Sequence, residues 1–228
     1  MQTVIDGIEI TITRKAIKNM YLYVKPPDGR VELSAPMRQG EDSIRAFILL
    51  KLGWIRRRQE QIARRSVPQK RAFVAGEPLY VWGRKYVLRV TEGKRYSLVL
   101  EGDDALFTVR GGSASDRRER FVNEWYRALL IAEIKRLLPK WEGLTGLQPS
   151  SWQTKNMTTR WGTCNVKSRK IWLSLQLAQK PKECLEYVIV HELTHLKERG
   201  HNARFQSLMD QFMPDWRERK RSLNGGER

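Results

Sequence analysis

The most constraining feature of this sequence is the stretch VIVHELTHLKERGH at residues 188–201. The chain of 228 residues contains three histidines, and all three lie in this stretch: His191, His195 and His201. The residues just before His191, LEYVIV, are apolar apart from one glutamate. Apolar residues at this density favour a buried helix, which would hold the histidines close together inside the fold.

The first two histidines form the pattern H-E-x-x-H. On a helix, His191 and His195 are separated by about 400° of rotation, so they lie on one face, one turn apart. Two imidazoles placed in this way match the first two ligands of a tetrahedral metal site. Glu192 follows the first histidine, where its carboxylate can reach a water molecule at the metal. The pattern therefore predicts two metal ligands and a general base.

The third histidine needs a break in the helix. His201 lies six residues after His195, a net rotation of about 240°, so it cannot share that face of one helix. Gly200 stands directly before it, and glycine commonly ends helices in a left-handed conformation. We therefore expect His201 to turn back as a third ligand. Three imidazoles favour Zn²⁺, although iron, nickel and cobalt also accept nitrogen ligands.

The two cysteines are not expected to bind the metal or to form a disulfide framework. Cys184 shares the helix face of His191 but lies about 10 Å along the axis from it, which is too far for a zinc–sulfur bond. We expect Cys184 in the core. Cys164 is interpreted as a small buried residue in a turn, with a position near the site as the alternative.

The chain is strongly basic, with 43 Lys and Arg against 25 Asp and Glu, and a formal net charge of +18. A charge of this size favours polyanionic partners, including non-specific nucleic acid. The excess is concentrated between residues 51 and 71, and a solvated basic face is the alternative interpretation. The residues considered for nucleic-acid contact are Arg56, Arg57, Arg58, Arg64 and Arg65.

No membrane contact is expected, because the longest apolar runs, such as AFILL, are five residues long. The first residues, MQTVIDGIEI, do not resemble a basic-then-apolar signal segment. Together with the low cysteine content, these features predict a cytoplasmic protein.

The first part of the chain alternates apolar and polar residues in the manner of strands, and PPDG (26–29) predicts a hairpin turn. Apolar residues at helical spacing follow, with Asp42 or Ser43 as the cap and an end near Pro68. Strand-like alternation returns between residues 78 and 110, interrupted by glycines.

The later part is mainly helical. Apolar residues that recur at intervals of three and four positions predict a long helix. It is expected to begin near Ser115 and to be ended by Gly143 and Gly146. A hairpin is expected across residues 168–170. Two further helices are expected at 181–199 and 201–212. We find no repeats in the sequence.

The end of the chain resembles the YgjP-like metallopeptidases, a family of predicted metal-dependent hydrolases. Their pattern is an apolar run, H-E-L-x-H-L, a third histidine six residues after the second, a phenylalanine four residues later, and P-D-W. Here these features are residues 191–196, His201, Phe205 and 214–216. RWGTC (160–164) matches a second family signature, R-W-G-x-C, and the N-terminal half also fits. One departure is Gln206, where the family often has tryptophan.

The resemblance implies an α+β fold with a β-rich N-terminal region that includes one helix (1–112), followed by a zincin-like metallopeptidase domain (113–228) with a small sheet. It implies Zn²⁺ held by the three histidines, Glu192 as general base, and a peptide or protein substrate. The strand at Ile171–Leu175 is expected to pair with an extended peptide. The candidates for oxyanion stabilisation or substrate binding are Arg160, Asn156, Tyr187 and Arg204.

Two other functions stay open at this point. The related SprT-like proteases are also basic and act on proteins attached to DNA, so one alternative is a hydrolase associated with nucleic acid. The other is a metal-stabilised binding module with little turnover. Glu192 argues against the binding module, because a purely structural metal site does not need a base at this position.

Overall fold

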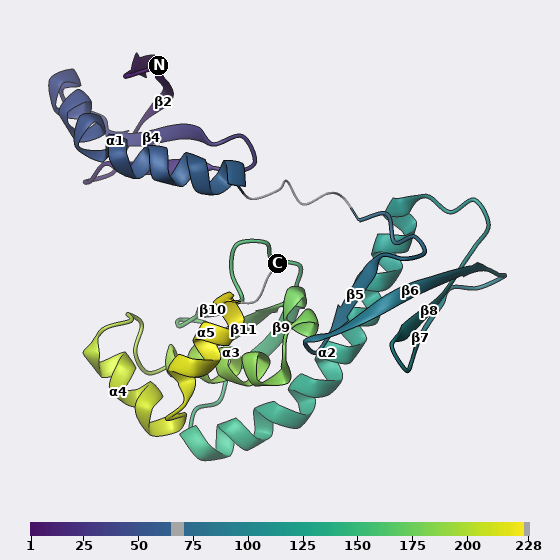
Figure 1. The fold of residues 1–228 in the computed structure, drawn as a ribbon. Coiled ribbons are helices and arrows are strands. Elements are labelled where there is room, and N and C mark those ends of the chain that lie inside the picture. Colours follow the sequence, from purple (N-terminus) through teal and green to yellow (C-terminus); the bar gives the residue numbers. More distant parts are fainter. Residues whose placement is uncertain (65–70, 226–228) are drawn as a thin grey trace. The chain divides into compact units, whose positions relative to one another are not determined.

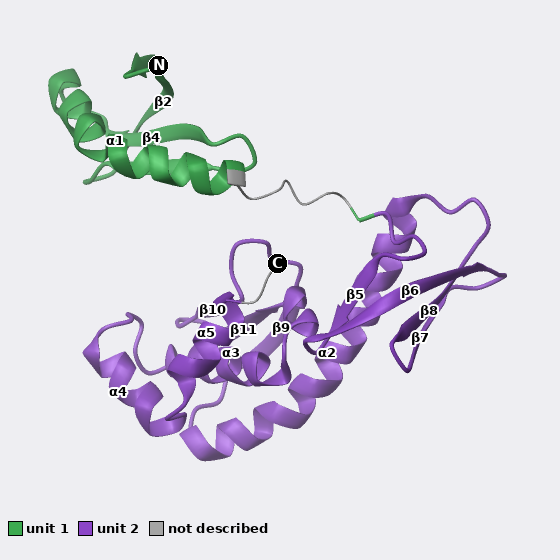
Figure 2. Cartoon of the chain, viewed as in Figure 1, with its two compact units in different colours: residues 1–71 green, residues 72–228 purple. Residues whose placement is uncertain are grey.

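The computed structural model describes residues 1–64 and 71–225. The chain divides into two compact units, Met1–Arg71 and Ala72–Arg228 (Figure 2). The described residues form five α-helices and three small mixed sheets, which confirms the expected α+β class.

Unit 1 is a four-stranded sheet with a helix packed against it (Figure 1). Its elements are β1 (Gln2–Ile5), β2 (Ile8–Lys15), β3 (Tyr21–Lys25), β4 (Arg30–Pro36) and α1 (Glu41–Arg64). The strand order is β1-β2-β4-β3, in which β2 and β4 are parallel and the outer pairs are antiparallel. The hairpin predicted at residues 26–29 is confirmed between β3 and β4.

Isoleucines form most of the core of unit 1. The alternating residues Ile8, Ile10 and Ile12 of β2 share one buried cluster with Ile48 and Ile55 of α1. Helix α1 begins at Glu41, slightly before the expected cap. The predicted end near residue 68 lies outside the described part of the chain.

Unit 2 begins with four more strands and a long helix. These are β5 (Pro78–Val81), β6 (Arg84–Glu92), β7 (Ser97–Glu101), β8 (Asp104–Val109) and α2 (Ser115–Thr145). Helix α2 continues through Gly143 and ends before Gly146, which adopts a left-handed conformation with φ 68°. Of the two glycines expected to end the helix, Gly146 does so and Gly143 lies inside it.

The two units share one arrangement that the sequence does not reveal as a repeat. In each unit the first two strands are antiparallel, the second and fourth are parallel, the third and fourth are antiparallel, and a helix follows. Two-residue turns with positive φ, Asp6-Gly7 and Trp82-Gly83, join the first two strands in both. A sheet and helix of this kind require only a pattern of apolar and polar positions, so many unrelated side chains satisfy the same arrangement.

The rest of unit 2 contains a three-stranded sheet and further helices. These are β9 (Ser151–Lys155), β10 (Gly162–Asn165), β11 (Lys170–Ser174), the short 3-10 helix η1 (Leu175–Gln179), α3 (Lys182–Thr194), α4 (Ala203–Phe212) and α5 (Trp216–Gly225). The sheet order is β10-β11-β9, so β11 is central and β10 lies at an edge. The hairpin predicted across residues 168–170 is confirmed as β10–β11, whereas α5 was not predicted.

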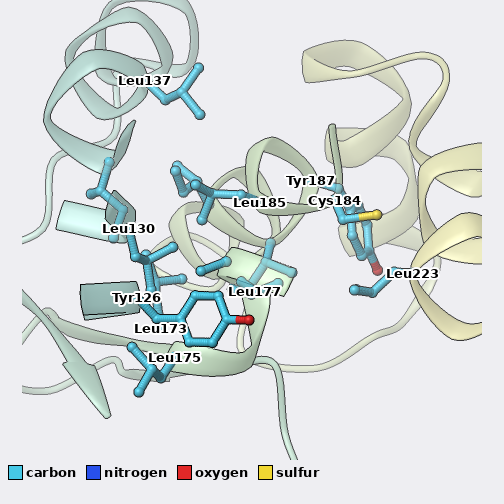
Figure 3. Close-up of a cluster of buried hydrophobic side chains, with 14 of the residues drawn as sticks. Tyr126, Leu130, Leu137, Leu173, Leu175, Leu177, Cys184, Leu185, Tyr187 and Leu223 are labelled. Carbon is cyan, nitrogen blue, oxygen red and sulfur yellow. The ribbon is translucent and has the colours of Figure 1, made fainter. Parts of the chain in front are cut away.

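One continuous core connects the elements of unit 2 (Figure 3). Leu130 of α2, Leu173 of β11 and Leu185 of α3 belong to it, together with the inner residues of β5–β8. The change from strands to helices near residue 112, used to divide the sequence, is therefore not a boundary between compact units. The units meet instead at residues 71 and 72, because β5–β8 share their core with α2.

Candidate metal centre and active site

Helix α3 carries the first two histidines at its C-terminal end. The helix ends at Thr194, five residues before the expected end. The N–H groups of Leu196 and Lys197 donate to carbonyls three residues back, at 2.9 and 3.0 Å, which tightens the last turn. His195 keeps a helical conformation with φ −62° and ψ −20°, and its N–H donates to the carbonyl of His191. The two imidazoles therefore lie on one face, as the spacing predicted.

The chain after α3 brings His201 back to the same place. Gly200 does not adopt a left-handed conformation, so the prediction that this glycine breaks the helix is wrong. The tightened turn described above has already ended the helix. Asn202 then caps α4, because its side-chain oxygen accepts a hydrogen bond from the N–H of Phe205 at 3.0 Å.

The three imidazoles converge on one point. Their possible ligand atoms all lie within 4.8 Å of one another. His191 Nε2 lies 3.2 Å from His195 Nε2 and 3.0 Å from His201 Nε2. Nitrogens bound to tetrahedral zinc at about 2.05 Å are about 3.3 Å apart, so the two distances to His191 fit an ion of that size. Neutral imidazole nitrogens that face one another need a proton or a cation between them, and this donor set suits a cation.

Neighbouring groups orient two of the rings. His195 Nδ1 lies 3.1 Å from the carbonyl oxygen of Glu198. Nδ1–H donates to that carbonyl, which leaves the lone pair of Nε2 directed at the centre. The hydroxyl of Tyr187 lies 3.4 Å from His191 Nδ1, and the Tyr187 ring stacks on Trp216.

The ring of Phe205 packs against all three imidazoles. Its centroid lies 5.0 Å from that of His191, 4.7 Å from that of His195 and 4.8 Å from that of His201. Phe205 is buried. Its position in the family pattern singled it out in the sequence, but its contact with each ring is visible only in the structure.

The environment keeps the two helical histidines neutral. Burial lowers the pKa of His191 to about 3, and the nearby His195 and His201 rings act in the same direction. Burial also lowers the pKa of His195. Neutral imidazole is the form that binds metal, so both side chains are in the ligating state at physiological pH.

Glu192 lines the same cleft as the imidazoles and is 4% exposed. Burial raises its pKa to about 8, and the charge of Arg160 partly offsets this rise. Glu192 Oε2 is buried and has no hydrogen-bond partner among the described residues. A buried carboxylate oxygen of this kind normally contacts water or an ion, and the residues present therefore fit a metal centre with a solvent molecule beside Glu192.

Gly162 of β10 packs directly on the Glu192 side chain. A Cβ atom at Gly162 would lie 2.5 Å from Glu192 Oε1 and 2.8 Å from its Cγ. Any larger residue at this position would collide with the carboxylate. Sequence reasoning missed this role, although Gly162 is the glycine of the R-W-G-x-C signature.

A cleft of about 800 Å³ opens over the histidines. One wall is β10 with the turn that follows it, including Gly162, Thr163 and Cys164. The other lining residues include Glu192 and the three histidines, together with Arg199 from the segment between α3 and α4. An extended ligand that lies along β10 therefore passes over the candidate metal centre.

Of the four residues considered for oxyanion stabilisation or substrate binding, Arg160 lines the cleft. Asn156 accepts a hydrogen bond from Gln176 at 2.9 Å and is not among the lining residues. Tyr187 supports His191 as described, and Arg204 lies 3.8 Å from Glu198 in an ion pair. Neither of these two lines the cleft.

The strand expected to pair with a peptide is the wrong one. Ile171–Leu175 corresponds to β11 and the first residue of η1, and β11 is hydrogen-bonded on both sides, to β10 and to β9. Its backbone groups are already paired, so a peptide cannot add to it. β10 is the edge strand on the cleft side.

The cysteines are not ligands in this arrangement. Cys184 is buried in the core, as predicted, with its sulfur 3.8 Å from the Ser222 hydroxyl. Cys164 lies on β10 and lines the cleft, so its interpretation as a turn residue is wrong. Burial, followed by the charge of Glu192, raises the pKa of Cys164 to about 11, and the thiol stays protonated at neutral pH.

The basic cluster considered for nucleic-acid contact belongs to unit 1. Arg56 forms an ion pair with Asp6, and Arg58 donates a hydrogen bond to the neutral amide of Gln61 at 3.1 Å, so the charge of Arg56 is paired within the unit. Arg65 lies outside the described residues. Nucleic-acid contact by this cluster stays a prediction.

A family model described as "YgjP-like, metallopeptidase domain" matches residues 18–225. The chain belongs to the YgjP-like family. Membership supports a metal-dependent peptidase and agrees with the resemblance found at the histidines. A comparison with curated proteins gave no match. None of the helices within the described ranges combines the length and apolar character needed to cross a membrane.

Among solved structures, the chain is similar to the metallopeptidase zymogen of Pyrococcus abyssi abylysin. The two share 20% sequence identity over 40% of this chain and 92% of that chain, with a TM-score of 0.38.

Proposed function

We propose that this YgjP-like protein is a zinc-dependent peptidase with His191, His195 and His201 as the metal ligands and Glu192 as the general base. The observation that carries the proposal is the convergence of three imidazoles beside a buried carboxylate in an open cleft. Zn²⁺ is the favoured ion because the site offers three nitrogen donors and no thiolate.

The chemistry divides between the ion and the side chains. A bound Zn²⁺ lowers the pKa of a coordinated water molecule to about 7. The positive charge of an ion held by the three imidazoles would favour the ionised form of Glu192 against the effect of burial. Glu192 would then accept the proton from the attacking water and deliver it to the leaving amine nitrogen. Its Oε2, which has no hydrogen-bond partner among the described residues, is the atom that receives the proton. Because Gly162 has no side chain, the carboxylate can lie directly against the backbone of β10.

The substrate binds along β10. An edge strand has unpaired N–H and C=O groups that hydrogen-bond to an extended peptide, while the side chains of that peptide alternate between cleft and solvent. Arg160 lies two residues before this strand, within electrostatic range of Glu192. It is the candidate for stabilising the negative charge that develops on the carbonyl oxygen during attack.

A comparison of wild type with Glu192→Gln tests the proposal. Glutamine keeps the size and shape of the side chain and its helix propensity, but it cannot accept a proton. We expect zinc content and fold to be retained and hydrolysis to fall by about 10²- to 10⁴-fold. A proteome-wide cleavage comparison of the two proteins identifies the substrates, and undiminished cleavage by a fully loaded Glu192→Gln protein would refute the mechanism.

A further inference from the structure

The rim of the cleft carries positive charge that no carboxylate at the rim balances. Arg160, Lys167 and Arg199 line the cleft, and all three are exposed. Among the described lining residues the carboxylate is that of Glu192, which is buried. A ligand that enters from solvent therefore meets three cations before it reaches the centre.

These cations surround the line along which a peptide would bind. Arg160 precedes β10, and Lys167 lies in the turn between β10 and β11. Arg199 lines the cleft from the segment between His195 and His201. Arg160 and Lys167 are seven residues apart, so an extended chain between them spans at most about 23 Å. A peptide across the centre therefore has its flanking residues, up to about three on either side of the reacting bond, within reach of a cation.

The acidic residue next to Arg199, Glu198, already has partners within the protein. Glu198 pairs with Arg204 at 3.8 Å, and its Oε1 accepts a hydrogen bond from the N–H of Gly200. Within residues 1–64 and 71–225, neither Lys167 nor Arg199 forms an ion pair with a carboxylate. Their charges remain available to a ligand.

We propose that this cleft selects peptide segments with Asp or Glu side chains within about three residues of the bond to be cut. The inference rests on the proposed peptidase function and adds the chemical class of its substrate. Carboxylates beside the reacting bond would meet Arg160 and Lys167 near the two ends of β10 and Arg199 from the segment between α3 and α4. A basic peptide would instead place like charges against the same three residues.

A peptide fits these cations better than a nucleic acid does. The cleft wall between Arg160 and Lys167 is a strand edge, and its free N–H and C=O groups match the backbone of an extended peptide. Trp172 of β11 is the one tryptophan, tyrosine or phenylalanine among the described lining residues, whereas grooves for single-stranded nucleic acid offer a series of aromatic side chains on which successive bases stack.

Binding to the Glu192→Gln protein, loaded with zinc, tests the inference without turnover. The probes are fluorescent peptides of about ten residues that are identical except for Glu, Gln or Lys at the positions flanking the centre. We expect the Glu peptide to bind about tenfold more tightly than the Gln peptide, because each of three exposed charge pairs contributes about two- to threefold. The preference should shrink between about 50 mM and 500 mM salt.

Two pairs of charge reversals locate the effect. Lys167→Glu with Arg199→Glu should abolish the preference for the Glu peptide. Lys94→Glu with Lys135→Glu changes the net charge equally at exposed positions outside the cleft, and it should leave the preference intact. Circular dichroism checks the fold, and Lys167→Gln and Arg199→Gln replace the double reversal if it does not fold.

The outcomes separate the two proposals. Equal binding of the three peptides, or a preference that survives the cleft reversals, overturns the inference. An oligonucleotide of similar length that binds more tightly than the Glu peptide and displaces it would assign the cations to phosphate, and also overturns it. Cleavage is measured separately with wild type: a charge preference in binding without cleavage of any bound peptide refutes the peptidase and not the preference.

Discussion

Gly162→Ala is the sharpest test of the geometry around Glu192. A Cβ atom at this position would lie 2.5 Å from Glu192 Oε1, 2.8 Å from Cγ and 2.9 Å from Cδ, whereas ordinary contact begins at 3.4 Å. The shortfall at Oε1 is 0.9 Å. Because the carboxylate is the end of a flexible side chain beside an open cleft, it can move while the backbone stays.

A displacement of this size matters for catalysis more than for folding. A shift of about 1 Å in a reacting group costs up to about 10²-fold in rate, or about 2.7 kcal/mol of transition-state stabilisation. Gly162 does not need a positive φ, so alanine introduces no backbone strain there. We expect kcat/KM to fall by about 10²-fold, with zinc content unchanged and the thermal midpoint within a few degrees of wild type.

The assay is hydrolysis of a peptide identified in the Glu192→Gln comparison, with zinc measured by elemental analysis. The matched control is Gly143→Ala. A Cβ there meets no atom within 4 Å, and the residue is exposed to solvent and lies away from the ends of α2. That variant should be fully active and slightly more stable, by about 0.5–1 kcal/mol. A Gly162→Ala protein with a kcat/KM within about twofold of wild type would refute the positioning argument.

Three further predictions concern the centre and its supports. Wild type should hold close to one zinc per chain and His201→Ala should lose most of it; full occupancy in that variant, by elemental analysis, would place the third ligand elsewhere. Phe205→Leu should weaken zinc binding by about 10- to 100-fold, because the ring supports all three imidazoles; an unchanged dissociation constant in a chelator competition would contradict this support. Burial raises the pKa of Glu186, but its hydrogen bonds with Lys140 and Arg219 outweigh burial and leave the pKa below its ordinary value. A lowered carboxylate pKa stabilises the fold above about pH 4.3 and loses that effect as pH falls through the folded value. Glu186→Gln should therefore cost about 1–3 kcal/mol at pH 7 and much less near pH 3, as measured by urea unfolding; an equal cost at both would contradict it.

Local patterns were sufficient to predict most elements of the fold. The three-and-four spacing gave α2, and alternation with turn residues gave the hairpins, because these signals depend on neighbours along the chain. The ends of helices were less predictable. Gly143 lies inside α2, and α3 ends at Thr194 without a glycine, since packing and tightened hydrogen bonds decide both positions. The basic segment of α5 has few apolar residues to reveal its helix.

The candidate site was predictable only where its residues are close in sequence. His191, Glu192 and His195 follow from helical geometry, and His201 from its distance to them. The contact between Gly162 and Glu192 joins positions thirty residues apart, and only the fold brings them together. The choice between β10 and β11 as the peptide-binding strand likewise depended on sheet order, which a hairpin pattern alone does not specify.

Because the two units have the same strand order, the helix of one unit could pack on the sheet of the other while the chain folds. Neighbouring modules of one architecture risk exchanging helices, a common route to misassembly. Here the two cores differ in chemistry. The buried residues of the unit 1 core are all aliphatic, whereas α2 brings Tyr126, whose hydroxyl donates to the carbonyl of Tyr80 at 2.7 Å. Tyr126 is one of the largest fully buried side chains, and the buried residues of the unit 1 core include no ring of that size, so overpacking would oppose the exchange. This difference in side-chain size therefore helps each helix to pack on the sheet beside it in the chain.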